Sequence, residues 1–372
     1  MDKHLHIVTH EVPWPADHGG IFDLFYKIKS LHQVGIKIHL HCFSKFNTPQ
    51  PILNKYCETV DYYQRKKSHS IFKFGTPFIV QSRNDVSLLR NLNKDNYPVL
   101  LEGIHCTFFY KKLNPQRKVF IRLHNAECTY YKHLAKHEKN LLKKIYFHIE
   151  SMLLYRYEKK IAQKGTFWAV SKDDIDFYIN KFGTKQIKYL PVFIPWSTIK
   201  SNMVHGNYCL YHGNLSVNEN EKAAIWLLKE VFSKINIPFV IAGKNPSITL
   251  KKLAHSFTHT CIVENPSEHE MEDLIKKAQI NILPSFNKTG VKLKILHALT
   301  NGKHCLVNSR AIKGNDLESY CHIANDSAQF IKETERLFSI SLSEEEIDER
   351  RNIVENLFSN IENAKQINSW IY

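Results

Sequence analysis

The segment 282–307, ILPSFNKTGVKLKILHALTNGKHCLV, constrains the fold most, because it places one helical pattern between two apolar runs. The first run ends at Pro284, a polar loop follows to Gly290, and the helical pattern continues to Gly302. The second run covers 304–307. Short apolar runs that alternate with helices are typical of a parallel sheet covered by helices. The segment therefore predicts an α/β protein.

The loop and the first helical turn of this segment suit a phosphate group. Backbone N–H groups at a helix N-terminus lack intrahelical partners and attract anions, and Gly290 lets a ligand approach the backbone closely. Lys292 and Lys294 stand two apart on the helix and so point in different directions. We expect Lys292 to face the phosphate and Lys294 to lie in solvent. The predicted phosphate-binding residues here are Thr289, Gly290, Val291 and Lys292.

The rest of the chain repeats this alternation of strands and helices. With 372 residues it exceeds what one core usually organises, so two domains are expected. Prolines at 191 and 195 interrupt the pattern. We predict two Rossmann-like, doubly wound domains over 1–195 and 196–345, followed by a helix over 346–372 that packs back on the first domain. Ligands bind at the carboxyl ends of parallel strands, so the expected site is a cleft between the domains.

Charge and composition limit the partners. The hydrophobic fraction of 43% is that of a globular protein, and the formal charge of +15 favours anionic ligands. Nucleic acid is not expected, because no basic–aromatic recognition motif is present. Eight cysteines are scattered without a C-x-x-C pair, and no H-E-x-x-H spacing occurs, so we expect neither a metal site nor a cofactor. The N-terminus resembles no signal peptide and no run of ~20 apolar residues occurs, so we expect a cytoplasmic protein.

Two loops in the first half follow predicted strands. PWPADHGG ends in Gly19 and Gly20, whose N–H groups can face an anion at a helix start, although a plain tight turn explains the pair equally well. RLHNAE places His124 at the carboxyl end of a strand. A histidine there can accept a proton or bind a sugar hydroxyl, and a purely structural role is the alternative.

The motif YHGNLSVNENEKAAIWLL, 211–228, is the corresponding turn of the second half. Gly213 and Asn214 follow a strand and precede a helix, so their backbone can approach a phosphate. The alternative is an ordinary strand-to-helix turn in which Asn214 forms local hydrogen bonds.

The motifs HGNLSVNENEKAAIWLL and PSFNKTGVKLKILHALTNGKHCLV together resemble glycosyltransferase family 4, which has the GT-B fold. PWPADHGG, HNAE and WAVSKDD support this resemblance, which covers the chain from His4 to about Gly314. It implies a retaining, metal-independent transfer of a hexose from a nucleotide-diphosphate sugar. The implied donor carries UDP or GDP, and the implied acceptor is a glycan or a lipid-linked sugar in bacterial surface polysaccharide or glycoconjugate synthesis.

The resemblance also implies roles for the residues named above. Gly19 and Gly20 would approach the donor phosphates or the acceptor. Gly213, Asn214 and Lys292 would hold the diphosphate. His124 would contact the transferred sugar and is the catalytic candidate.

One departure from the family pattern concerns the ribose. The family carries two glutamates eight positions apart, which correspond here to Thr289 and His297. His297 is therefore the ribose-binding candidate, but a neutral histidine cannot match a carboxylate that accepts two hydrogen bonds. A catalytically impaired sugar-nucleotide-binding subunit is thus the main alternative. An epimerase using Glu102 and Glu127 is a further one.

The helical stretch 129–164 is rich in lysine and in apolar residues. Such a surface can rest on acidic lipid, which would place the protein peripherally at the inner face of the membrane. The alternative is a solvated basic face on a helix that packs against the core.

Overall fold

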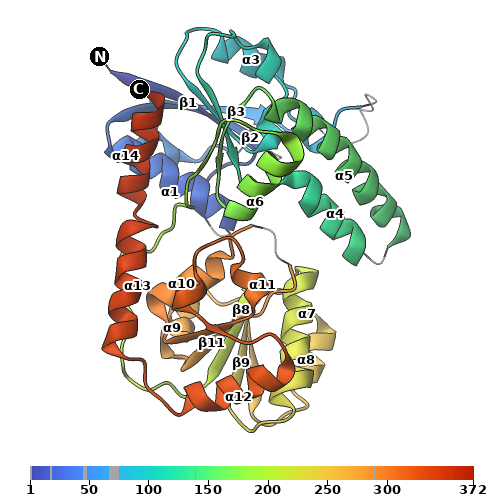
Figure 1. Ribbon diagram of the computed structural model, residues 1–372, viewed down its shortest axis with the longest axis vertical. Coiled ribbons are helices and arrows are strands. Elements are labelled where there is room, and N and C mark those ends of the chain that lie inside the picture. Colours follow the sequence, from blue (N-terminus) through green and yellow to red (C-terminus); the bar gives the residue numbers. More distant parts are fainter. Residues whose placement is uncertain (1, 17–18, 45–47, 67–74, 139, 288–289) are drawn as a thin grey trace. The chain divides into compact units, whose positions relative to one another are not determined.

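The structure is a computed structural model that describes residues 2–16, 19–44, 48–66, 75–138, 140–287 and 290–372 (Figure 1). The chain divides into two compact units. Unit 1 comprises Met1–Pro195 and Phe358–Tyr372, and unit 2 comprises Trp196–Leu357. No helix in the described ranges is long and apolar enough to cross a bilayer.

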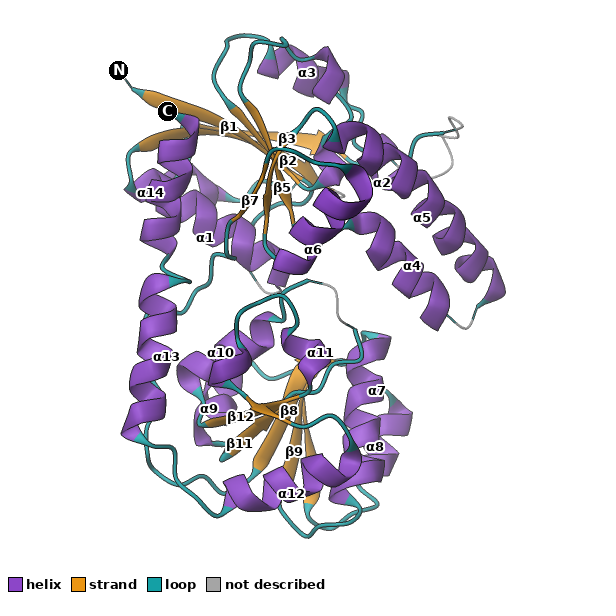
Figure 2. Cartoon of the chain, viewed as in Figure 1, coloured by secondary structure: helices purple, strands orange, loops and turns teal. Residues whose placement is uncertain are grey.

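Unit 1 contains a seven-stranded sheet in the order β3-β2-β1-β4-β5-β6-β7, in which every pairing is parallel (Figure 2). Its strands are β1 (Lys3–Thr9), β2 (Ile36–Ser44), β3 (Thr59–Gln64), β4 (Val99–Glu102), β5 (Val119–Leu123), β6 (Thr166–Ala169) and β7 (Ile187–Tyr189). Its helices are α1 (Gly19–Gln33), α2 (Phe78–Gln81), α3 (Val86–Leu92), α4 (Glu127–His137), α5 (Leu141–Ala162), α6 (Lys172–Phe177) and α14 (Asn360–Ile371).

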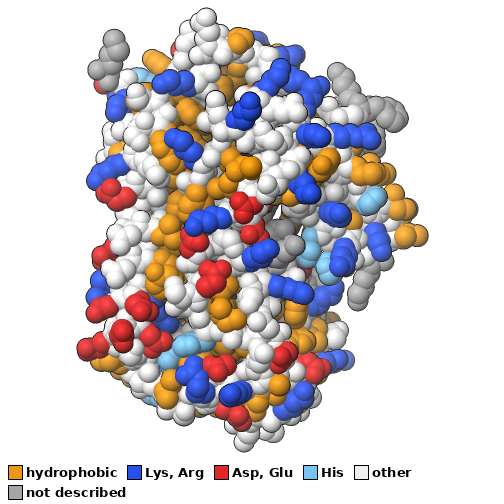
Figure 3. Space-filling view, in the orientation of Figure 1, with side chains coloured by type: hydrophobic (Ala, Val, Ile, Leu, Met, Phe, Trp, Pro, Cys, Tyr) orange, Lys and Arg blue, Asp and Glu red, His pale blue; other side chains and the backbone are white. Residues whose placement is uncertain are grey.

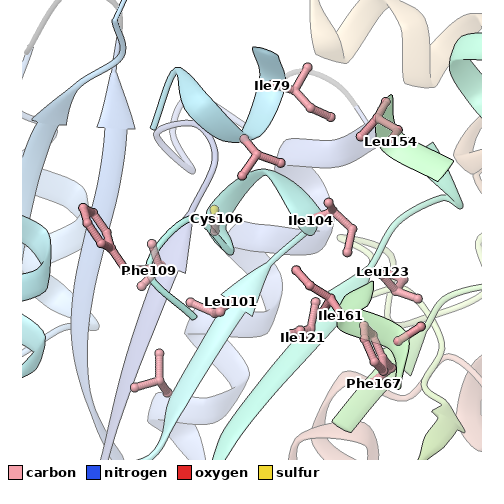
Figure 4. Packing of buried hydrophobic residues seen from close by; sticks show 14 of the residues in the cluster. Ile79, Leu101, Ile104, Cys106, Phe109, Ile121, Leu123, Leu154, Ile161 and Phe167 are labelled. Carbon is pink, nitrogen blue, oxygen red and sulfur yellow. The ribbon is translucent and has the colours of Figure 1, made fainter. Parts of the chain in front are cut away.

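The two faces of this sheet are buried in separate apolar clusters. Neighbouring residues of a strand point to opposite faces, so Leu100 and Leu101 of β4 pack into different clusters. Leu101 lies in the cluster that also holds Leu154 and Ile161 of α5 (Figure 4). Burial on both faces explains why the strands read as short apolar runs in the sequence.

The C-terminal segment differs from the single helix expected over 346–372. It forms two helices, α13 (Glu344–Asn356) in unit 2 and α14 in unit 1. Ile367 and Ile371 of α14 are buried in the cluster that contains Leu5 and Ile28 of unit 1. Ile353 and Val354 of α13 are also buried, but α13 belongs to unit 2.

The helical stretch expected over 129–164 is likewise two helices, α4 and α5. The side chain of Asn140 caps α5 by accepting a hydrogen bond from the N–H of Lys143 at 3.1 Å. The carboxylate of Glu158, on α5, accepts the N–H groups of Glu127 and Cys128 at 2.9 and 2.8 Å. It thereby supplies hydrogen-bond acceptors for two N–H groups at the N-terminus of α4 and fixes the start of that helix.

Unit 2 contains a six-stranded parallel sheet in the order β10-β9-β8-β11-β12-β13. Its strands are β8 (Cys209–Asn214), β9 (Phe239–Lys244), β10 (Thr260–Glu264), β11 (Ile280–Ile282), β12 (His304–Val307) and β13 (His322–Ile323). Its remaining helices are α7 (Asn218–Leu227), α8 (Ile248–Ala254), α9 (Glu268–Lys277), α10 (Leu293–Asn301), α11 (Ser309–Ile312) and α12 (Ser327–Phe338). The predicted α/β class with two parallel sheets is confirmed.

Candidate functional site

A cluster of charged side chains lies at the carboxyl ends of β4 and β5 in unit 1. His124 follows β5 directly, Glu102 ends β4, and Asp23 comes from α1. Nε2 of His124 lies 3.1 Å from a carboxylate oxygen of Glu102, and its Nδ1 lies 3.7 Å from Oδ2 of Asp23. The two carboxylates therefore hold the imidazole ring from both sides. The His124 side chain remains 17% exposed, so a ligand can reach it.

Two buried cations neutralise these carboxylates. Nζ of Lys27 lies 2.8 Å from Asp23 and 2.9 Å from Glu102, and the guanidinium of Arg122 lies 3.1 Å from Asp23. Burial alone would raise the pKa of Asp23, but Arg122 and Lys27 outweigh it and lower that pKa. In the same way, Lys27 and His124 lower the pKa of Glu102 against the effect of burial. Both acids are therefore ionised.

This charge balance bears on metal binding at the cluster. Ligand atoms of Asp23, Glu102 and His124 all lie within 4.8 Å of one another, as a metal site requires. Each carboxylate, however, already contacts a buried lysine or arginine. A divalent cation would have to displace these partners, so the cluster fits a role in holding His124 better than a role in holding a metal.

Two further histidines surround His124, and the sequence analysis missed both. His10 follows β1, and its ring centroid lies 5.7 Å from that of His124 and 5.0 Å from that of His105. His105 follows β4 by way of Gly103, which has a φ of +83°. All three histidines follow strands that end at one edge of the sheet. The sequence could therefore have predicted His10 and His105 as site residues, because each follows the end of a predicted strand.

Gly19 and Gly20 form the start of α1, the helix that also carries Asp23 and Lys27. A Cβ atom at Gly20 would meet no atom of the described residues within 4 Å. Packing of the protein itself therefore does not require a glycine at this position. Their contact with a phosphate or an acceptor stays a prediction.

The start of α10 in unit 2 has the features expected of a phosphate site. Gly290 has a φ of +65°, which glycine adopts without strain, and Lys292 is the N-cap residue of α10. The Lys292 side chain does not cap this helix, so it leaves the first N–H groups of α10 available to another acceptor. Val291 is half-buried beside them. Thr289 lies outside the described residues.

Lys294 corrects one expectation, because it is not a solvated side chain. Its Nζ lies 3.2 Å from the hydroxyl of Tyr211 and 3.3 Å from Oδ1 of Asn220, and 4.5 Å from the centre of the Tyr211 ring. Burial, aided by Lys292, lowers the pKa of Lys294 to about 7. The helical spacing correctly predicts that the two lysines point in different directions, but Tyr211 of β8 and Asn220 of α7 contact Lys294 and remove it from bulk solvent.

The β8–α7 turn and the loop before α10 are tied together. The amide of Asn287 donates to Glu219 at 3.1 Å, and the amide of Asn220 donates to the carbonyl of Asn214 at 2.9 Å. Gly213 and Asn214 thus lie at the same sheet edge as the start of α10. The Asn214 side chain accepts the N–H of Ser216 at 3.1 Å, which is the local turn role given above as the alternative.

His297 lies in the second turn of α10, in an aromatic environment. Its ring stacks on Trp196 with centroids 4.1 Å apart, and its centroid lies 6.1 Å from that of His212. Burial lowers the pKa of His297 to about 4, so the ring is neutral. Its Nε2 is buried and has no hydrogen-bond partner among the described residues. Binding of ribose by this nitrogen stays a prediction.

Comparison of the whole chain with solved structures defines its fold class. Sucrose-phosphate synthase from Thermosynechococcus elongatus superposes with a TM-score of 0.69 at 11% identity, over 99% of this chain and 98% of the synthase. A variant of S. aureus TarM, solved with fondaparinux, α-GlcNAc-glycerol and UDP, superposes with a TM-score of 0.67 at 10% identity, over 99% of each chain. The protein has the GT-B fold of glycosyltransferases.

One curated relative places the chain in a particular family. It is an uncharacterized 44.6 kDa protein in the cps region of Klebsiella pneumoniae, 30% identical over 350 residues, which are 88% of each protein. The chain belongs to the family of this cps-region protein. No family model matches the sequence.

Proposed function

We propose that the protein is a retaining, metal-independent glycosyltransferase that moves a hexose from a nucleotide-diphosphate sugar to a glycan or lipid-linked acceptor. The GT-B fold supports the reaction class. The relative in a cps region supports a role in surface polysaccharide or glycoconjugate synthesis.

The start of α10 is the observation that carries this proposal. It combines a helix N-terminus that its own N-cap side chain does not cap, Gly290 in the left-handed region and Lys292 at the N-cap. These groups supply the positive potential that a diphosphate requires without a bound cation. Lys294, which is partly buried, holds this helical turn against Tyr211 and adds charge when it is protonated.

The TarM variant that superposes on this chain was solved in complex with UDP and α-GlcNAc-glycerol. We therefore propose a UDP-sugar as the first donor to test and a GDP-sugar as the second. Gly213 and Asn214 would offer their backbone to the diphosphate from the same edge of the unit 2 sheet.

His124 is the residue that we propose to contact the transferred sugar. Glu102 holds Nε2 at 3.1 Å, whereas Nδ1 lies 3.7 Å from Asp23, which is beyond hydrogen-bond distance. Nδ1 is therefore the nitrogen that we propose to meet a sugar hydroxyl group. An imidazole oriented in this way can donate or accept one hydrogen bond to the sugar as charge develops at the anomeric carbon.

The acceptor side is proposed to include an acidic membrane surface. Helix α5 exposes a series of apolar side chains among lysines, and the space-filling view shows basic and apolar groups gathered over α4 and α5 (Figure 3). The exposed apolar residues are Leu141, Leu142, Ile145, Tyr146, Ile149, Met152 and Tyr155. These side chains therefore lie on a face of α5 that is not packed against the core of its own unit. A basic, apolar helix face is suited to the lipid–water interface.

A catalytically impaired sugar-nucleotide-binding subunit is the second candidate, and His297 is the observation that favours it. A neutral ring stacked on Trp196 offers one nitrogen where a carboxylate would accept two hydrogen bonds. Nucleotide binding would then persist without turnover.

Calorimetric titration of the full chain with UDP, GDP and uridine tests the phosphate site, first in buffer and then with a chelator. We expect UDP to bind at least about 10-fold more tightly than uridine, with no loss in chelator. Lys292→Ala should remove this advantage, whereas the exposed-site control Lys229→Ala should retain it. Equal affinities of UDP and uridine, or an unchanged Lys292→Ala protein, would contradict the proposal.

A further inference from the structure

A second group of ligating side chains lies in unit 2, away from the start of α10. His304 is the first residue of β12, His322 is the first residue of β13, and Glu346 lies in the first turn of α13. The candidate phosphate site is at the carboxyl ends of the strands, whereas this group is at their amino ends. The reaction proposed above makes no use of it.

Two of the three distances between the ligating atoms match the edges of a metal tetrahedron, and the third is slightly longer. Nδ1 of His304 lies 3.2 Å from Nε2 of His322, which lies 3.4 Å from Oε1 of Glu346. The third edge, from Nδ1 of His304 to Oε1 of Glu346, is 4.0 Å. Tetrahedral ligands about 2.0–2.1 Å from Zn²⁺ lie about 3.3–3.4 Å apart. A small inward movement of Glu346 would complete the geometry.

The surrounding hydrogen bonds orient two of the ligands. Nε2 of His304 lies 3.1 Å from the carbonyl oxygen of Ile340, so it carries the proton and leaves the Nδ1 lone pair directed at the group. Such a bond from the second ring nitrogen to a carbonyl is usual for metal-bound histidines. The other oxygen of Glu346 accepts the N–H of Ser343 at 3.0 Å, which fixes Oε1 on the side of the histidines.

The space beside the group accommodates a fourth ligand. A cavity of ≈60 Å³ is lined by His322, Glu346, Glu349 and Arg350, among others. This is more than the ~10–15 Å³ that one water molecule needs. The guanidinium of Arg350 donates to the carbonyl of Lys303 at 2.7 Å, and the carboxylates of Glu346 and Glu349 both offset its charge.

We propose that His304, His322 and Glu346 bind one divalent transition-metal ion, with Zn²⁺ as the best fit and water as the fourth ligand. Two imidazoles and one carboxylate with tetrahedral spacing are the donor set that Zn²⁺ prefers. The ion would join α13 to the β12–β13 edge of the sheet. The sequence analysis expected no metal, because the chain contains neither a C-x-x-C pair nor an H-E-x-x-H spacing. Positions 304, 322 and 346 lie too far apart in the sequence to form such a motif.

Metal titration of the full-length protein tests this site. After treatment with a chelator, the protein should bind one Zn²⁺ per chain in competition with a chromophoric indicator. Bound Co²⁺ should give the visible spectrum of a tetrahedral site without a thiolate charge-transfer band. Glu346→Gln and His322→Ala should each weaken Zn²⁺ binding by more than about 10-fold. Glu346→Gln should fold normally, because glutamine can also form the capping box with Ser343.

Two control variants separate this site from other metal ligands. His205→Ala removes an exposed histidine of unit 2, and Cys321→Ser removes the thiol next to His322. Both should bind Zn²⁺ as the wild type does. Three results would overturn the proposal: no stoichiometric binding, unchanged affinity in both ligand variants, or a thiolate band that disappears in Cys321→Ser. None of these results depends on glycosyl transfer.

Discussion

At the scale of single residues, Glu127 shows how position in the fold sets the charge of a side chain. It begins α4, is 5% exposed and lies near the carboxylates of Glu158 and Asp174. Burial and then Glu158 raise the pKa of Glu127 to about 8. At neutral pH the acid is therefore mostly protonated in the folded protein and ionised in the unfolded chain.

The pH dependence of stability follows from this difference. The stability associated with Glu127 is fully present below the unfolded pKa near 4.5 and is lost as pH rises toward 8. Glu127→Gln cannot ionise, so its free energy of unfolding relative to wild type should increase between pH 5 and pH 8, by up to about 4 kcal/mol. Denaturant unfolding at several pH values measures this.

The matched control for this prediction is Glu268→Gln, at an exposed position on α9. It should leave the pH dependence of unfolding as in the wild type. A Glu127→Gln protein whose stability relative to wild type is the same at pH 5 and pH 8 would show that the acid is ionised in the folded state.

At the scale of elements, helix α5 has exposed apolar side chains that packing within unit 1 does not explain. Leu142 is 78% exposed and Ile145 is 49% exposed, and Lys143 and Lys144 lie between them. Several exposed apolar side chains this close together indicate a surface that binds another molecule. Acidic lipid accounts for both the apolar and the basic residues.

Liposome co-sedimentation tests this reading of α5. The wild type should bind vesicles that contain acidic lipid and release them in high salt. The double variant Leu142→Ser with Ile145→Ser should bind at least about 10-fold more weakly, because each change removes about 2 kcal/mol of apolar transfer energy. Its thermal unfolding should stay close to that of the wild type, since neither side chain is buried.

The control for the lipid experiment is Ile248→Ser in unit 2, where the isoleucine is 71% exposed on α8. It should bind vesicles as the wild type does. Sedimentation that is independent of acidic lipid, or equal for the double variant and the wild type, would favour the solvated basic face instead.

At the scale of the whole molecule, the sequence predicts the two parallel sheets, because strands buried on both faces appear as apolar runs between helices. It does not predict where the C-terminal helices pack. Ile367 and Ile371 of α14 show an apolar face, but helical periodicity does not say which sheet that face covers. The break between α4 and α5 also depends on tertiary contacts, such as Glu158 at the N-terminus of α4.

The candidate site is predictable where a functional residue directly follows a strand. His124 and Gly213 are of this kind, because the carboxyl ends of parallel strands share one edge. Asp23 and Arg122 are not, because they lie within a helix and a strand and pair across 99 positions of the chain. Lys294 was placed wrongly for the same reason, since its partners Tyr211 and Asn220 come from another part of unit 2.

Release of free nucleotide from a panel of UDP- and GDP-sugars, with and without glycan acceptors, tests the central claim most directly. We predict slow release from one donor, acceleration by an acceptor, and loss of release in Lys292→Ala. His124→Ala should also lose release while it still binds UDP. Binding of UDP without release from any donor would contradict the claim and identify the protein as an impaired sugar-nucleotide-binding subunit.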